Sequence, residues 1–185
     1  MSSSGIGSGN LVGLPGSESN HNIAIGNYSG NAVFGDANNA IGEGSGNVVI
    51  GDSNKVFGDY AGNFVSGDRN SANSFLSGNF VAGNDNNVTG TGSGNFIWGD
   101  RNSANGDGSG NFIAGNDNQA SGTGSGNFIL GSGNQASGTG VGNFVIGLNN
   151  QAEGALSGNG VIGNNNTASV FGSGNGVVGI NNDAN

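Results

Sequence analysis

β-branched apolar residues recur along this chain with a period of sixteen residues. Each stands two residues after an Asn, and the row comprises Val33, Val49, Val65, Val81, Ile97, Ile113, Ile129, Val145, Val161 and Val177. The other half of each repeat carries Ala or Val two residues after a second Asn, from Ala24 to Ala184. Because strand side chains alternate between two faces, each repeat predicts two short strands that place Asn and the small apolar residue on one face.

Glycines mark the ends of these strands. They recur every sixteen residues from Gly30 to Gly174 and again from Gly35 to Gly179. Such positions suit corners with positive φ or close backbone approach. The pattern predicts an all-β fold, a β-solenoid with two short strands per coil and about ten coils, roughly 48 Å long at a spacing of ~4.8 Å. Residues 1–21 are expected to form an irregular lead-in or degenerate first coil, and residues 22–185 a single solenoid.

The two Asn rows are predicted to stabilise the thin core, which buries little apolar area per residue. One row begins at Asn22 and recurs to Asn182, and the second is the structural ladder of Asn31, Asn47, Asn63, Asn79, Asn95, Asn111, Asn127, Asn143, Asn159 and Asn175. Amides stacked at one coil spacing can hydrogen-bond to the coils above and below, and can also cap corner backbone groups. The alternative is that these Asn are exposed turn residues.

The outward positions differ between the two halves. In the Asn-x-Ala half they are mostly Ser, Gln, Asn and Thr, which is typical of a solvated face. In the other half they predict a self-association face of Phe64, Phe80, Phe96, Trp98, Phe112, Phe128, Leu130, Phe144 and Ile146. Burying a large apolar side chain contributes about 1.5–3 kcal/mol, so this row is large enough to offset the cost of association. The alternative reverses the two faces, with Phe inward and Asn outward.

Three smaller features accompany this face. Ile25, Ile41 and Phe57 predict a further outward contact patch near the N-terminal end. The charges of Arg69, Asp85, Arg101 and Asp117 alternate coil by coil, which sets opposite charges one strand spacing apart. Asp36, Asp52 and Asp68 form a row of like charges, for which mild repulsion is expected and binding of a divalent cation is the alternative.

Composition narrows the function classes. The chain has 185 residues with 42 Gly, no Cys, only three basic residues and a net charge of −9. We expect no nucleic-acid partner, because there is no basic patch, and no membrane span, because no apolar stretch is long enough. With one His, no thiol and no convergent carboxylates, the sequence predicts no enzyme, no metal site and no cofactor.

Three kinds of Asn/Gly-rich repeat protein resemble parts of this chain. "NNVTG" (86–90) and "GNVVIG" (46–51) resemble the ryegrass-type ice-recrystallisation-inhibiting solenoids. "NIAIGNYSGNAVFG" (22–35) is similar to head repeats of trimeric autotransporter adhesins, and "GTGSGNF" (122–128) to repeats of curli-type amyloid subunits. These resemblances imply a β-solenoid or β-roll that binds ice or another surface, or that associates with itself.

The sequence therefore favours a structural protein whose partner is itself. We expect filaments of a functional amyloid-like kind, formed by end-to-end stacking of uncapped coils and by lateral packing of the Phe-rich face, at the cell surface or outside the cell. Frayed terminal coils are the alternative to end-to-end stacking. The alternative function is a solenoid that binds ice or another repetitive surface, as an adhesin does.

Overall fold

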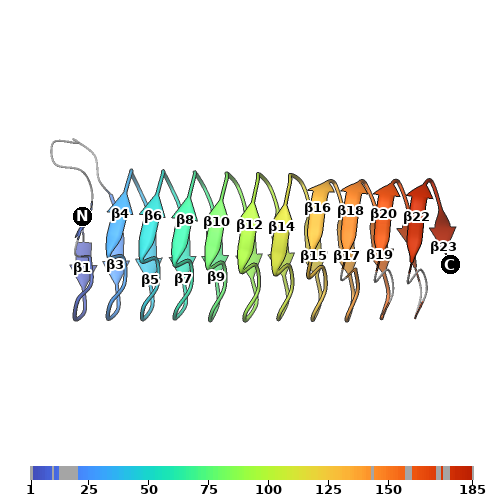
Figure 1. The fold of residues 1–185 in the computed structure, drawn as a ribbon. Helices are drawn as coiled ribbons and strands as arrows, with labels where there is room; N and C mark the ends of the chain where they lie inside the picture. The colour runs from blue at the N-terminus through green and yellow to red at the C-terminus, as the bar shows by residue number, and fades with distance from the viewer. Residues whose placement is uncertain are drawn as a thin grey trace.

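Two parallel sheets, formed by alternate strands of the chain, make up the fold (Figure 1). The computed structural model describes residues 2–9, 11–12, 21–142, 144–156, 160–169, 172 and 176–184. The strands of the 12-stranded sheet are β1 (Ser2–Ser4), β3 (Ile23–Ile25), β5 (Asn39–Ile41), β7 (Lys55–Phe57), β9 (Ser71–Asn73), β11 (Asn87–Thr89), β13 (Ser103–Asn105), β15 (Gln119–Ser121), β17 (Gln135–Ser137), β19 (Gln151–Glu153), β21 (Thr167–Ala168) and β23 (Asp183–Ala184). The strands of the 11-stranded sheet are β2 (Leu11–Val12), β4 (Ala32–Phe34), β6 (Val48–Ile50), β8 (Phe64–Ser66), β10 (Phe80–Ala82), β12 (Phe96–Trp98), β14 (Phe112–Ala114), β16 (Ile129–Ser132), β18 (Val145–Leu148), β20 (Val161–Asn164) and β22 (Val177–Ile180).

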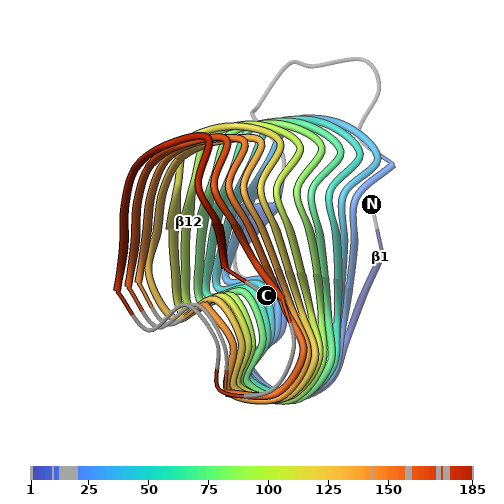
Figure 2. The same ribbon diagram turned by 90° about the vertical axis from the view of Figure 1, so that its right-hand side faces the viewer.

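The coils stack in register, one sixteen-residue repeat upon the next. Phe96 pairs with Phe112 in one sheet, and Ser103 pairs with Gln119 in the other. Seen along the axis, successive coils follow nearly the same outline (Figure 2). The predicted all-β solenoid with two strands per coil and about ten coils is confirmed.

The N-terminal coil keeps this pairing with a longer spacing. Ser2 pairs with Ile23 and Leu11 with Ala32, so equivalent residues are 21 apart there instead of 16. Residues 13–20, which belong to the predicted lead-in of residues 1–21, lie outside the described residues.

The core is a thin layer between the sheets, to which each strand from β3 to β22 contributes one buried residue. Ala104 on β13 and Ile97 and Ile113 on the facing sheet are all fully buried, and the same alternation continues from Ala24 and Val33 onward. Small residues on one sheet oppose Val or Ile on the other, because the sixteen-residue coil leaves room for only one such layer. The residues on either side of each buried residue point outward, as the period-two alternation predicts.

Glycine is required at two kinds of corner. Gly99 has φ 124°, and a Cβ there would overlap the carbonyl oxygen of Gly115 in the next coil. Gly110 has φ 57°, and a Cβ there would lie 2.7 Å from the Cβ of Ala104. Both corners therefore fix the spacing at which the chain packs against itself.

Replacing Gly110 with Ala tests this packing, with Gly108→Ala as a matched control. The two glycines have almost the same φ, 57° and 61°, but a Cβ at Gly108 meets nothing within 4 Å. Both variants carry the strain of a left-handed alanine, and only Gly110→Ala crowds the core. We expect Gly110→Ala to lower the free energy of unfolding by about 1–3 kcal/mol more than Gly108→Ala in chemical denaturation. Equal losses would contradict the packing explanation.

Candidate functional site

A ladder of buried Asn side chains runs along the inside of the solenoid. Asn102, 1% exposed, donates from Nδ2 to the Gly115 carbonyl oxygen at 2.7 Å. Its Oδ1 accepts from both the backbone N–H and the Nδ2 of Asn118, each at 3.1 Å. The buried members of this ladder are Asn22, Asn38, Asn54, Asn70, Asn86, Asn102, Asn118, Asn134, Asn150 and Asn166. Each amide thus caps a corner and holds the next coil, which rules out exposed turn residues for this row.

The second Asn row forms a ladder at the rim of the core. Asn31 donates to the Oδ1 of Asn47 at 2.8 Å, and the same bond continues coil by coil to Asn127. These side chains are partly exposed, and that of Asn95 is exposed. They follow directly on a glycine corner, where the chain has only begun to enter the strand, so water reaches them. Asn143, Asn159 and Asn175 lie outside the described residues.

Two further polar rows complete the hydrogen bonding between and within the coils: a buried row of Ser, and a row of Asp and Asn at the outer corners, called the outer Asx row. Neither row was predicted from the sequence. Ser109 is fully buried and donates from Oγ to the Gly106 carbonyl oxygen at 2.9 Å, and Ser29, Ser45, Ser77, Ser93 and Ser125 make the equivalent bond. The repeated Ser-Gly-Asn triplet was the available signal for this row.

The Asp row predicted to show like-charge repulsion belongs to that outer Asx row. The Oδ1 of Asp52 accepts the backbone N–H of Asp36 at 2.8 Å, and the Oδ1 of Asp68 accepts that of Asp52 at 2.9 Å. Asn84, Asp100 and Asn116 continue the pattern. Each carboxylate is therefore an acceptor for the neighbouring coil, which offsets the proximity of like charges. Among the described residues, no group of three or more His, Cys, Asp or Glu side chains is arranged to hold a metal ion.

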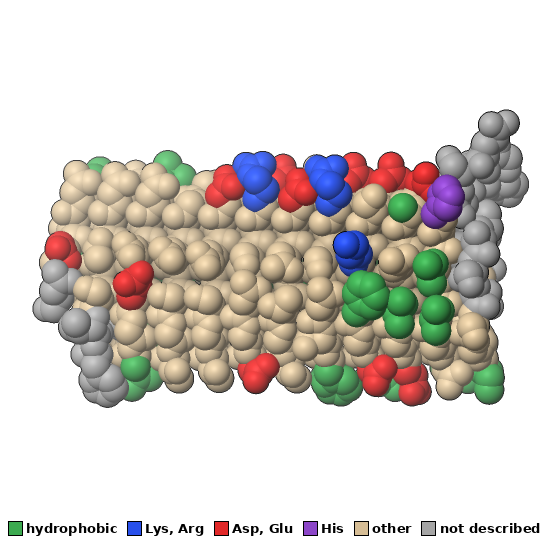
Figure 3. Space-filling view, turned by 180° about the vertical axis from the view of Figure 1, so that it is seen from behind, with side chains coloured by type: hydrophobic (Ala, Val, Ile, Leu, Met, Phe, Trp, Pro, Cys, Tyr) green, Lys and Arg blue, Asp and Glu red, His purple; other side chains and the backbone are tan. Residues whose placement is uncertain are grey.

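The alternating charges pair as the sequence predicts. Arg69 forms a two-bond ion pair with Asp85, at 2.7 and 2.9 Å, and Arg101 forms another with Asp117. The hydrogen bond from each guanidinium lowers the pKa of the paired carboxyl below its usual value. All four residues have positive φ near 57°, and acidic and basic side chains alternate along one edge of the molecule (Figure 3). The pairs fix the register of these exposed corners.

The predicted self-association face lies on the outside of the 11-stranded sheet, with Val and Ile buried behind it. This arrangement excludes the reversed orientation. The rings of Phe64, Phe80, Phe96, Phe112, Phe128 and Phe144 stack in one continuous row, with centroids 4.7–5.0 Å apart and planes within 11° of parallel. Each inner ring covers the faces of its neighbours, so these Phe are partly buried and Phe144 is 39% exposed. In a single copy of the chain, the Phe row therefore exposes less apolar area than a row of isolated rings would.

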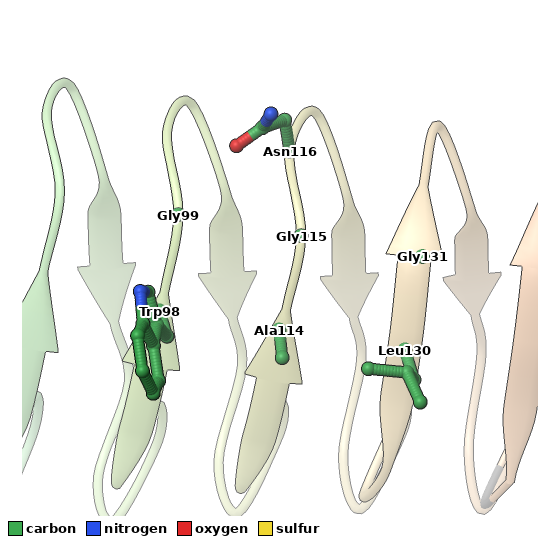
Figure 4. A pocket seen from close by; sticks show the side chains of 7 residues that line it. All are labelled: Trp98, Gly99, Ala114, Gly115, Asn116, Leu130 and Gly131. Carbon is green, nitrogen blue, oxygen red and sulfur yellow. The ribbon is translucent and has the colours of Figure 1, made fainter.

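The second outward row of this sheet is more exposed and less uniform. It includes Trp98 at 64%, Leu130 at 41% and the partly buried Ile146. Between Trp98 and Leu130 stands the small Ala114, and the three residues border a groove of about 440 Å³ (Figure 4). Its floor is largely backbone at Gly99, Gly115 and Gly131, and Asn116 closes one side. The face thus carries one prominent indole beside a gap.

The smaller predicted patch lies on the other sheet. Ile25 pairs with Ile41, and Ile41 with Phe57, on neighbouring strands β3, β5 and β7. Ile25 is 41% exposed, whereas Ile41 and Phe57 are partly buried. Hydrophobic side chains gather near the N-terminal end of an otherwise polar face in Figure 3. Beyond this patch the 12-stranded sheet presents mainly Ser, Gln and Asn.

Comparisons with protein-family models, with curated proteins and with solved structures gave no significant match. The described part of the chain contains no helix that is long and apolar enough to cross a membrane.

Truncation of one Asn in each ladder measures how far the buried ladder stabilises the fold. Asn102→Ala removes the partners of the Gly115 carbonyl and the Asn118 N–H inside the core, at about 1–3 kcal/mol for each buried group left unpaired. Asn111→Ala removes two bonds at the rim, one from Asn95 and one to Asn127, but water can replace both, so the total loss should be only about 0.5–1.5 kcal/mol. Chemical denaturation of both variants provides the comparison. A loss for Asn111→Ala as large as that for Asn102→Ala would refute a special role for the buried row.

Proposed function

We propose that this chain is a structural, self-assembling protein and not an enzyme. It forms filaments by end-to-end coil stacking and by lateral packing of the Phe-rich face of the 11-stranded sheet. The observation that carries the proposal is the make-up of this face. At its described outward positions from Ala32 to Val178 no side chain is charged, and all are apolar except Ser66, Gly160 and Gly176.

The size of this face supports association. About ten coils at ~4.8 Å and three residues per strand at ~3.3 Å give a strip of roughly 48 by 10 Å, or about 480 Å². The largest apolar patch of a typical soluble monomer is about 300–600 Å² and is often functional. Because the Phe rings already cover one another, much of the contact energy comes from the exposed side chains in the second row. These are Ile50, Trp98, Leu130, Ile162 and Val178.

End-to-end contact rests on the same hydrogen-bond pattern that joins the coils. β1 and β23 lie at opposite edges of the 12-stranded sheet, and all strands in it are parallel. A further parallel strand can add to such an edge through the bonds that join β21 to β23. The resemblance to autotransporter head repeats and curli-type subunits supports a location outside the cell or at its surface.

Lateral packing is tested by changing Phe96, Phe112 and Phe128 together to Ser. The matched control changes Gln119, Gln135 and Gln151 to Ser on the polar sheet, which leaves the Phe-rich face intact. We expect the wild-type protein and the control to give assemblies that grow with concentration and contain laterally paired solenoids, and the Phe variant to give smaller assemblies without lateral pairing. Sedimentation velocity over a dilution series, with negative-stain electron microscopy of the same samples, measures this. Wild-type protein that stays monomeric throughout would overturn the proposal.

Ice binding, or binding of another repetitive surface, is the alternative function. Thr91, Thr123 and Thr139 are exposed in one corner row, one coil or two apart, with Asp107 in the remaining position. A row of hydroxyl and methyl groups at regular spacing suits a repetitive surface. If this were the function, micromolar protein would slow ice recrystallisation, and Thr123→Asp would abolish the effect. We expect no effect from the wild-type protein, and a clear one would favour the alternative.

A further inference from the structure

The central part of the outward row that contains Trp98, from Ser66 to Ile146, is self-complementary when its order is reversed. From β4 to β22 this row reads Phe34, Ile50, Ser66, Ala82, Trp98, Ala114, Leu130, Ile146, Ile162 and Val178. Reversal about a point midway between Trp98 and Ala114 matches a large with a small residue at each of these positions: Trp98 with Ala114, Leu130 with Ala82, and Ile146 with Ser66. Beyond them, apolar residues meet at the ends of the row, Ile50 with Ile162 and Phe34 with Val178. We propose that two copies pack face to face and antiparallel through the 11-stranded sheet, with Trp98 of each in the groove over Ala114 of the other.

The groove has room for an aromatic ring. Ala114 leaves a single position empty in a row spaced at one coil, between Trp98 and Leu130. In the neighbouring row one Phe ring per coil fits at 4.7–5.0 Å, so this spacing accepts an aromatic ring. An indole from a second copy therefore fills the gap that Ala114 leaves, and the two Trp98 rings stack on each other across the two-fold axis.

The antiparallel arrangement follows from the two rows together. A two-fold axis along the strands reverses the coil order but keeps each row opposite itself. The Phe row then faces a Phe row, which is uniform and tolerates any register, and the Trp98 row sets the register. A two-fold axis along the solenoid would instead place Trp98 against the bulky Phe96 of the same coil, and Ala82 and Ala114 against other Phe residues.

Neighbouring registers pack less well. A shift of one coil in one direction sets Trp98 against Trp98 and leaves Ala82 opposite Ala114, which pairs two large residues beside an empty space. A shift in the other direction sets Trp98 against Leu130 and Ala114 against Ala114. Of these three registers, only the proposed one opposes each large side chain between Ser66 and Ile146 with a small one. Opposing two large or two small side chains is costly in a packed interface.

The second copy is a better occupant than a partner of another chemistry. The face has no charged side chain to choose a charged ligand, and its regularity is that of the chain itself. Two strips of about 480 Å² together reach roughly 1,000 Å², the size at which specific protein interfaces begin. This inference rests on the proposed self-association and adds its geometry.

Exchange of the two central residues tests the register. Trp98→Ala empties both grooves, and Ala114→Trp brings two indoles into collision. Each should raise the dimer dissociation constant at least about 30-fold, as loss of a central Trp does in other interfaces. The double variant Trp98→Ala/Ala114→Trp recreates the same pairs with their roles exchanged, so it should restore the dissociation constant to within about threefold of wild type. Sedimentation equilibrium measures the constants, and circular dichroism confirms that each variant folds.

Cross-linking provides a second measurement that does not depend on packing energies. The chain has no Cys, so Ser66→Cys and Ile146→Cys introduce single reactive thiols. A bifunctional maleimide that spans the ~10 Å between packed sheets should join the two variants to each other when they are mixed. It should join neither to itself, because like positions lie about five coils, or ~24 Å, apart.

The outcomes separate the dimer geometry from the proposed function. If the protein associates but the double variant stays as weak as the single ones, or Ser66→Cys cross-links to itself, the antiparallel register is wrong while self-association stands. If the wild-type protein remains monomeric at every concentration, both fail. Rescue by the double variant together with the mixed cross-link establishes the geometry.

Discussion

Parallel stacking in register at one coil spacing is the constraint on which the rest of this structure depends. It places every side chain about 4.8 Å from its equivalents above and below, so each row must tolerate its own repetition. Asn does so because its amide both donates and accepts, and Asn102 uses both functions toward corner and neighbouring coil. Phe does so by ring stacking, and the corner charges by alternating in sign. The repeat thus selects residues that pair well with themselves.

The period-sixteen pattern was sufficient to predict the fold and the orientation of its faces. β-branched residues after Asn, with Gly at fixed offsets, left few alternatives to two-stranded coils. The difference between the two Asn rows was not predictable from spacing, because Asn22 and Asn31 both stand two residues before a small apolar residue. What separates them is the corner geometry. The first row turns its amide toward corner carbonyl groups inside the core, and the second lies at the rim, where water competes.

The sequence predicted which side chains face outward on the 11-stranded sheet, but not the shape of the surface that they form. The sequence placed Phe outward in a straight row, yet the stacked rings cover much of one another's surface. The exposed area that is left depends on the coil spacing and on the tilt of the rings. The groove beside Trp98 also escaped prediction, since it arises from the absence of a side chain at Ala114 between two large neighbours. Similarly, the Asp row was predicted to be repulsive, because the sequence does not show that each carboxylate accepts a backbone N–H of the neighbouring coil. Features that form between adjacent coils can be predicted only when the register of the coils is known as well as their composition.

The two outer faces of the solenoid differ in chemistry. The 12-stranded sheet carries Ser, Gln and Asn outward over most of its length, while the 11-stranded sheet carries apolar side chains without a described charge. We propose that the 11-stranded sheets of two copies pack against each other. Electron cryomicroscopy of the assemblies tests it most directly by showing which faces touch. The account predicts density in which 11-stranded sheets lie opposite one another with Trp98 inside the contact. Assemblies joined through the polar sheets, with Trp98 in solvent, would contradict it.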